Sequence, residues 1–273
     1  MASKPSLHKH FVQEPEITSI KNCLTSPLDK NFSNELTRFM IKLISNLTKN
    51  PKILPILFNQ GFLEILFNLL NYEKEKEIFG NVVTALAYFS ALKDAQDQII
   101  KAKIMARILE AKQLHVIDKK MIVIALTTML YNGPELQREF INNNGLGKML
   151  AFLKEKDKIF YQLSCKCFSI LSENKENLEK MIESECLNNI IINCLKNKDI
   201  DLETLKEITK IFINLILWHK LRTEAVETTC CLCDIGLMID DLDMNILSMF
   251  CLNALSEEDS NHKIIRSSGF SYN

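Results

Sequence analysis

The chain has 273 residues, of which 47% are hydrophobic and 25% are charged, and its formal net charge is −1. This balance is typical of a soluble, well-packed protein and excludes an intrinsically disordered chain. Because the net charge is close to zero, the composition also removes the simplest argument for binding to nucleic acid.

Helix breakers are rare, since the chain contains only seven Gly and six Pro and no Pro follows Pro134. Long periodic stretches with so few breakers predict helices joined by short turns. No segment approaches the roughly 18 continuous apolar residues needed to cross a bilayer, and the polar start of the chain lacks the apolar centre of a signal peptide. Together with nine cysteines, this indicates reduced thiols and a cytoplasmic protein, with the nucleus, cilium and cytoskeleton left open.

One stretch shows how each period of the chain is built. A short helix is expected over residues 51–59, and the pair Gln60-Gly61 then turns the chain. Apolar residues at 62, 65, 66 and 69 lie on one face of a medium helix over residues 62–70. A charged loop leads into a long helix over residues 78–92. Each period is therefore expected to contain three helices.

A helix-ending segment recurs along the chain. The third residues of all these segments form a set that we call the Asn-like column. A turn position comes 15 to 17 residues after each member of the column. Successive markers are 39 to 44 residues apart in both series, a period typical of an α-solenoid. The Asn-like column contains Asn46, Tyr88, Thr128, Ile170, Asn214 and Asn253, and the turn positions are Gly61, Lys103, Gly145, Cys186, Cys230 and Gly269.

This unit resembles the armadillo repeat, in which three helices carry a turn glycine and end in an Asn-Leu-like motif. Ser45-Asn46-Leu47 and Ile213-Asn214-Leu215 match the closing motif, and Gln60-Gly61-Phe62 and Ser268-Gly269-Phe270 match the turn. The resemblance covers roughly residues 17–270. It implies an all-α protein that is a right-handed superhelical α-solenoid of armadillo-like repeats. HEAT repeats share the general plan but lack the short first helix.

The resemblance also suggests where the array begins and ends. We expect a polar leader over residues 1–15, an array of a partial first unit and about five repeats over residues 16–257, and a truncated last repeat or tail over residues 258–273. The last long helix, expected over residues 244–255, then lacks a further repeat beside it. The chain could be a fragment or isoform of a longer protein, a partner or second copy could cover this helix, or the tail could fold back.

In armadillo proteins the long third helices line a concave groove for extended peptides. Here the groove would combine the Asn-like column with the positions four and eight residues earlier, which share one helical face. These positions contain no Trp and no acidic residue, so they resemble the basic groove of β-catenin-like members more than the Trp-rich groove of importin-α-like members. An Asn there could bind the backbone of an acidic ligand. The candidate partner-binding residues are Arg38, Lys42, Asn46, Tyr88, Lys120, Thr128, Lys166, Lys206, Lys210, Asn214 and Asn253.

Patterns for catalysis and metal binding are missing from the sequence. There is no Gly-rich phosphate loop, G-x-S-x-G or H-E-x-x-H motif, and the five histidines are scattered. Cys230 and Cys233 form a C-x-x-C pair, but the second pair of ligands that a zinc site needs is not visible. We therefore expect no enzyme, no cofactor and no metal site, and structural thiols.

The expected function is a non-enzymatic scaffold or adaptor whose groove holds an extended, acidic segment of a protein partner. One alternative is a structural subunit of a larger assembly that docks through the uncapped ends of the solenoid. A second alternative is a nucleic-acid binder that uses the same lysines, whose affinity would fall steeply with salt. Lysines on solvated helix faces are common without any binding role, so these interpretations stay open at this point.

Overall fold

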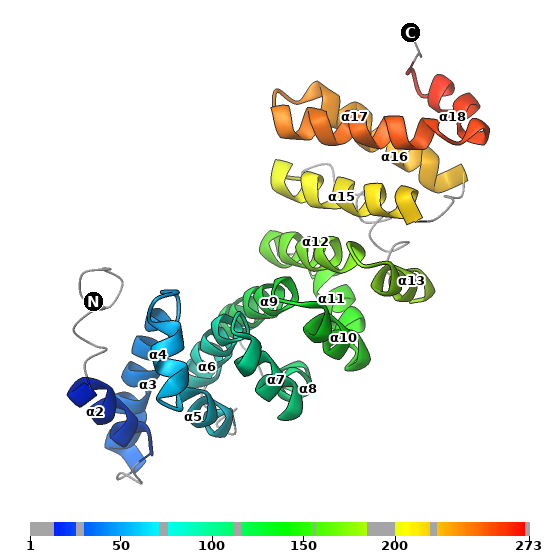
Figure 1. Cartoon of the computed structure of the whole chain (residues 1–273). Coiled ribbons are helices and arrows are strands. Elements are labelled where there is room, and N and C mark those ends of the chain that lie inside the picture. Colours follow the sequence, from blue (N-terminus) through cyan, green and yellow to red (C-terminus); the bar gives the residue numbers. More distant parts are fainter. Residues whose placement is uncertain are drawn as a thin grey trace. The chain divides into compact units, whose positions relative to one another are not determined.

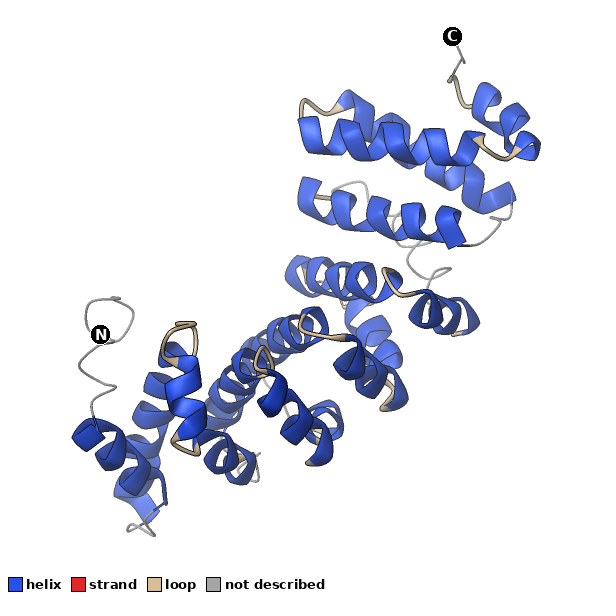
Figure 2. Cartoon of the chain, viewed as in Figure 1, coloured by secondary structure: helices blue, strands red, loops and turns tan. Residues whose placement is uncertain are grey.

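The computed structural model describes residues 14–25, 30–70, 76–111, 116–155, 157–184, 200–218 and 223–270. In these ranges every regular element is a helix and no strand is present (Figure 2). The all-α class predicted from the period is therefore confirmed. None of the helices in this part of the chain is long and apolar enough to span a membrane. Residues 1–13 of the expected leader and the turn position Cys186 lie outside the described residues.

The helices group into two compact units, Met1–Asn144 and Gly145–Asn273, and each unit is described by itself (Figure 1). The helices of the first unit are α2 (Glu14–Thr25), α3 (Lys30–Leu47), α4 (Leu54–Asn59), α5 (Phe62–Leu69), α6 (Lys76–Phe89), α7 (Lys93–Lys101), α8 (Ile104–Glu110), α9 (Val116–Tyr131) and α10 (Pro134–Asn142).

The first unit shows the predicted order of short, medium and long helices twice, in α4–α6 and in α7–α9. The long helices α3, α6 and α9 pack against one another in chain order. Ile44, Leu86 and Leu126 lie on these helices and are buried. Because burial of each such side chain contributes about 1.5–3 kcal/mol, the stacking of consecutive repeats is what stabilises the unit.

The second unit begins with the same order and then departs from it. Its long helices α12, α15 and α17 pack in chain order, and α16 packs against both α15 and α17. The elements of this unit are α11 (Gly145–Leu153), α12 (Lys158–Ser172), α13 (Lys175–Glu183), α15 (Leu202–Trp218), α16 (Thr223–Met238), α17 (Leu242–Ser256), the 3-10 helix η1 (Asp259–Asn261) and α18 (His262–Ser267).

A residue with left-handed backbone conformation lies two residues after the end of several of the short helices. Gly61 (φ 77°) and Gly269 (φ 93°) adopt this conformation as predicted, and Lys103 (φ 51°) adopts it despite its side chain. In the third turn the left-handed residue is Asn144 (φ 60°), so the prediction of Gly145 is wrong by one position. Gly145 is buried in the first turn of α11. Asparagine tolerates positive φ better than most other non-glycine residues, which explains the shift.

The turn predicted at Cys230 is wrong. Cys230 lies in the middle of α16 and is buried together with Val226 and Cys233. These positions have the i, i+4, i+7 spacing of one helical face, and no Gly or Pro interrupts α16 before Gly236. A single continuous helix therefore replaces the short and medium helices expected in this repeat.

The end of the second unit carries a small core of its own. Val226, Cys230, Leu255 and Ile265 are buried together, and Phe270 packs against them. Ile265 comes from α18, so this short helix covers the first half of α16 and the end of α17. The long helix expected over residues 244–255 is confirmed as α17, and η1 and α18 follow it.

Candidate partner-binding surface

The long helices of both units share one pattern of exposure. Four residues before the Asn-like column, Lys42 and Lys166 are exposed and the side chain of Lys210 is 44% exposed. The neighbouring position, three residues before the Asn-like column, is buried in each long helix from α3 to α15. Each of these helices therefore has one edge inside the stack and one edge in solvent. The buried positions are Leu43, Ala85, Ala125, Cys167 and Ile211.

In the first unit the described charged side chains of the long helices are mainly basic. The described side chains of its long helices include Arg38, Lys42, Lys119 and Lys120, and Glu35 is the one acidic residue among them. Lys42 is exposed, while Arg38 and Lys120 are half-buried. This excess of positive charge raises the local concentration of an acidic ligand and its association rate more than its final affinity.

The uncharged candidates of the first unit lie on the same helices and are half-buried. Asn46 Oδ1 accepts a hydrogen bond of 3.1 Å from Lys49 Nζ. The hydroxyl of Thr128 donates to the carbonyl oxygen of Ile124 at 3.0 Å. Tyr88 completes the Asn-like column on α6. The structure therefore places all six predicted residues of this unit on three adjacent helices.

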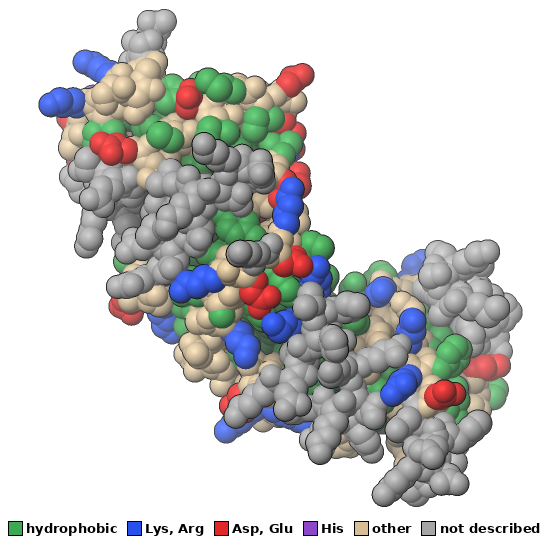
Figure 3. All heavy atoms as spheres, turned by 180° about the vertical axis from the view of Figure 1, so that it is seen from behind, with side chains coloured by type: hydrophobic (Ala, Val, Ile, Leu, Met, Phe, Trp, Pro, Cys, Tyr) green, Lys and Arg blue, Asp and Glu red, His purple; other side chains and the backbone are tan. Residues whose placement is uncertain are grey.

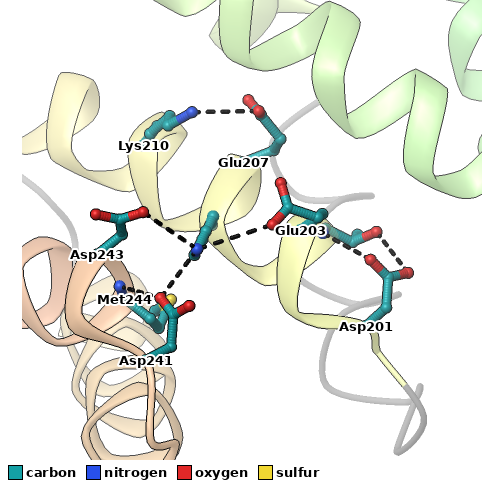
Figure 4. A network of polar contacts seen from close by, with 9 residues as sticks. Asp201, Glu203, Glu207, Lys210, Asp241, Asp243 and Met244 are labelled. Carbon is teal, nitrogen blue, oxygen red and sulfur yellow. Dashed lines mark hydrogen bonds and ion pairs between the residues drawn. The ribbon is translucent and has the colours of Figure 1, made fainter.

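In the second unit two of the three predicted lysines, Lys206 and Lys210, are paired with carboxylates. Lys206 Nζ lies 2.9 Å from Asp241, 3.6 Å from Asp243 and 3.8 Å from Glu203, and its side chain is only 12% exposed. The hydrogen bond to Asp241 raises the pKa of Lys206 and lowers the pKa of Asp241. The basic charge of α15 is therefore largely cancelled where it meets α17 (Figure 4).

Lys210 has a carboxylate of its own, because Glu207 lies 3.2 Å from its ammonium group. Figure 4 shows these two side chains pointing toward one another along α15. The i, i+3 spacing of Glu207 and Lys210 is readable in the sequence, whereas the approach of Asp241 and Asp243 to Lys206 depends on the packing of α17 against α15. Only Lys166 of the basic candidates in this unit is exposed without such a neighbour among the described residues.

The Asn-like column of the second unit takes part in the stacking of helices. Asn214 Nδ2 donates to Ser172 Oγ at 2.9 Å, which links α15 to α12. Ser172 Oγ in turn donates to the carbonyl of Ser169 at 2.7 Å. Ile170 is buried and Asn253 is exposed on α17. The Asn214 amide therefore already has a structural partner, and its availability for a ligand backbone stays a prediction.

The cysteine cluster of α16 and α17 lies inside the core. Cys230, Cys233 and Cys251 are buried, and Cys231 is exposed. Burial raises the pKa of Cys230 to about 11, and the hydrogen bond with Cys233 together with burial raises the pKa of Cys251. The thiols of Cys230 and Cys251 are therefore protonated at neutral pH. In the described part of the chain no group of three or more His, Cys, Asp or Glu residues could hold a metal ion.

Comparison with known proteins supports the fold at the level of structure. No family model and no curated protein matches the sequence. An engineered protein of a structural genomics consortium has a TM-score of 0.70 at 16% identity, over 93% of this chain and 98% of its own. A designed armadillo repeat protein has a TM-score of 0.71 at 18% identity, over 88% of this chain and 100% of its own.

A second designed armadillo repeat protein, in complex with the peptide (KR)4, has a TM-score of 0.70 at 16% identity. The match covers 88% of this chain and 99% of the designed one. The chain is therefore an all-α solenoid with the armadillo-like repeat fold, as the sequence predicted. At these identities the likeness concerns the fold alone.

Proposed function

We propose that this protein is a non-enzymatic scaffold that holds an extended segment of a protein partner along its long helices. The observation that carries the proposal is the column four residues before the Asn-like column, which is exposed or half-buried in every long helix, on helices that pack in chain order within each unit. Such an edge offers repeated contacts to a chain lying across it. The designed protein in complex with (KR)4 supports this use of the fold.

The segment we propose is acidic, and the first unit is its principal site. Over their full bounds, the long helices α3, α6 and α9 carry six Lys or Arg residues and three Asp or Glu residues. In the second unit Lys206 and Lys210 already have carboxylate neighbours, so they contribute less to an acidic ligand. A location in the cytoplasm is part of the same proposal, and it rests on the cysteine usage of the sequence.

The test is binding of fluorescent (DE)4 and (KR)4 peptides to the full chain, monitored by anisotropy at low salt. Wild type should prefer (DE)4. The double substitution Lys42→Glu/Lys120→Glu should weaken (DE)4 binding by about tenfold, because each reversal replaces an attraction by a repulsion. Circular dichroism should show unchanged helicity.

Arg138→Glu is the matched control, because Arg138 is exposed on the short helix α10 of the same unit. It should change (DE)4 binding by less than about twofold. The proposal is wrong if the control weakens binding as much as the double substitution, or if wild type prefers (KR)4. A nucleic-acid function would appear instead as binding of single- or double-stranded oligonucleotides with a steep loss of affinity in salt.

A further inference from the structure

Large apolar side chains are exposed along one face of α17. Leu242 is 74% exposed, Ile246 57%, Met249 59% and Phe250 50%. Their spacing of i, i+4, i+7 and i+8 places them on one side of the helix. On the preceding helix, Ile235 and Met238 of α16 are also exposed. We call these six residues the hairpin face, because α16 and α17 are joined by a short connection.

The exposure of Phe250 is unusual for its position in the repeat. It stands three residues before the Asn-like column, where Cys167 and Ile211 of the preceding long helices are fully buried. Both α12 and α15 have the next long helix packed against them. No element in the described part of the chain covers Phe250 in the same way, so α17 leaves exposed the side that the preceding long helices bury.

The short helix α18 does not close this surface. It packs through Ile265 on Val226, Cys230 and Leu255, at the start of α16 and the end of α17. The hairpin face runs from the end of α16 and the connection to the middle of α17. Several large exposed apolar side chains on one side of a helix mark interaction sites on proteins.

The charged side chains that α16, α17 and their connection place around the hairpin face are all acidic, and Lys206 of α15 pairs with two of them, Asp241 and Asp243. Residues 223–262 contain nine of the 34 Asp and Glu residues of the chain and none of its 33 Lys and Arg residues. Asp234, Asp240 and Asp243 are exposed on or between the two helices. In Figure 3, hydrophobic and acidic side chains lie next to one another over this end of the second unit. A second copy of the chain would bring acidic groups against acidic groups, which disfavours self-association.

We propose that the hairpin face binds an amphipathic helix of a partner protein, with Lys or Arg residues flanking its apolar stripe. The apolar stripe of α17 from Leu242 to Phe250 is about 12 Å long, which matches the contact of two packed helices. The acidic residues around it complement basic flanks and repel acidic ones. This site is distinct from the basic surface of the first unit in residues and in charge.

The probe is a labelled synthetic peptide of about 18 residues, with Leu at i, i+3, i+4 and i+7 of a helical repeat and Lys elsewhere. A reference peptide has Glu in place of every Lys. We expect the full chain to bind the Lys peptide at least about tenfold more tightly than the Glu peptide. Phe250→Lys and Ile246→Lys should each weaken the Lys peptide by about tenfold or more, and both positions are exposed enough for the fold to tolerate the change.

Phe39→Lys is the matched control, since Phe39 is a 62% exposed phenylalanine on the long helix α3 of the first unit. It should leave binding of the Lys peptide unchanged, and Phe250→Lys should leave (DE)4 binding unchanged, so the two proposals fail separately. The inference is overturned if Phe250→Lys binds the Lys peptide as tightly as wild type does. It is also overturned if Phe39→Lys weakens binding of the Lys peptide as much as Phe250→Lys does. It is also overturned if sedimentation shows a dimer that Phe250→Lys dissociates, because a second copy would then occupy the face.

Discussion

A close approach of two helices depends on one residue, Gly236 of α16. A Cβ atom at this position would overlap Ser248 Oγ and lie 2.6 Å from Met244 Cε, both of which belong to α17. Ser248 and Met244 are themselves buried, so they have little room to move. The absence of a side chain at Gly236 is therefore what lets α16 and α17 pack at this distance.

We predict that Gly236→Ala lowers the free energy of unfolding by about 1–3 kcal/mol, because it overpacks this contact. Urea denaturation monitored by circular dichroism measures the change. The control is Ile235→Ala, one residue earlier on the exposed side of the same helix, which should shift stability by no more than roughly 0.5 kcal/mol. If Gly236→Ala is as stable as wild type, then α17 shifts to accommodate the added methyl group without a measurable loss of stability, and the prediction is wrong.

At the scale of the element, the ion pair between Lys206 and Asp241 fastens α15 to the start of α17. Asp241 Oδ1 lies 2.9 Å from Lys206 Nζ and also accepts a hydrogen bond of 2.8 Å from the backbone N–H of Met244. One carboxylate thus caps α17 and binds the preceding long helix. The lowered pKa of Asp241 and the raised pKa of Lys206 both result from this hydrogen bond.

We predict that this link stabilises the protein through the middle of the pH range and weakens at both ends. The Asp241 contribution is present above the ordinary aspartate pKa of roughly 4 and is lost as the pH falls through the lower folded value. The Lys206 contribution is lost as the pH rises through a folded value above roughly 10. Asp241→Asn keeps an oxygen for the cap and removes the charge.

The stability difference between wild type and Asp241→Asn should therefore shrink toward acid pH, as measured by thermal unfolding in a series of buffers. Asp234→Asn serves as control, because Asp234 is exposed on α16 and its substitution should shift stability by no more than roughly 0.5 kcal/mol. A gap between wild type and Asp241→Asn that stays constant down to pH values well below roughly 3 would contradict the assignment.

The turns and helices show which sequence signals are sufficient to predict local structure and which are not. The turns at Gly61 and Gly269 could be predicted because a left-handed residue favours glycine. Asn144 supplies that conformation where a neighbouring glycine was expected, and Lys103 supplies it without any special residue type. The prediction at Cys230 failed because it relied on the position in the period and ignored the surrounding residues. The buried spacing of Val226, Cys230 and Cys233 already favours a continuous helix.

The candidate site could be predicted less completely than the fold. Periodicity along one helix places Lys42 and Lys166 in solvent, because a column of residues keeps its side of a helix. Contacts between helices are not contained in that periodicity. The sequence therefore could not show that Asp241 and Asp243 reach Lys206, or that Asn214 donates to Ser172.

At the scale of the whole molecule, basic and acidic residues are concentrated in different parts of the chain. Residues 223–262 carry nine acidic residues and no basic one, while the described side chains on the long helices of the first unit are mainly basic. A net charge of −1 hides this separation. The two proposed surfaces also differ in kind, since the first depends mainly on charge and the hairpin face combines charge with exposed apolar side chains such as Phe250.

We predict that peptide binding at the two surfaces depends differently on salt concentration. Raising NaCl from 0.1 to 1 M shortens the Debye length from about 10 Å to about 3 Å, so binding of (DE)4 should be nearly abolished. Binding of the Lys-rich amphipathic peptide should weaken at first and then level off, because salt does not weaken the apolar contact with Ile246 and Phe250. Anisotropy titrations of both peptides across the same salt series measure this, and an equal proportional loss for the two would mean that the hairpin face also binds by charge alone.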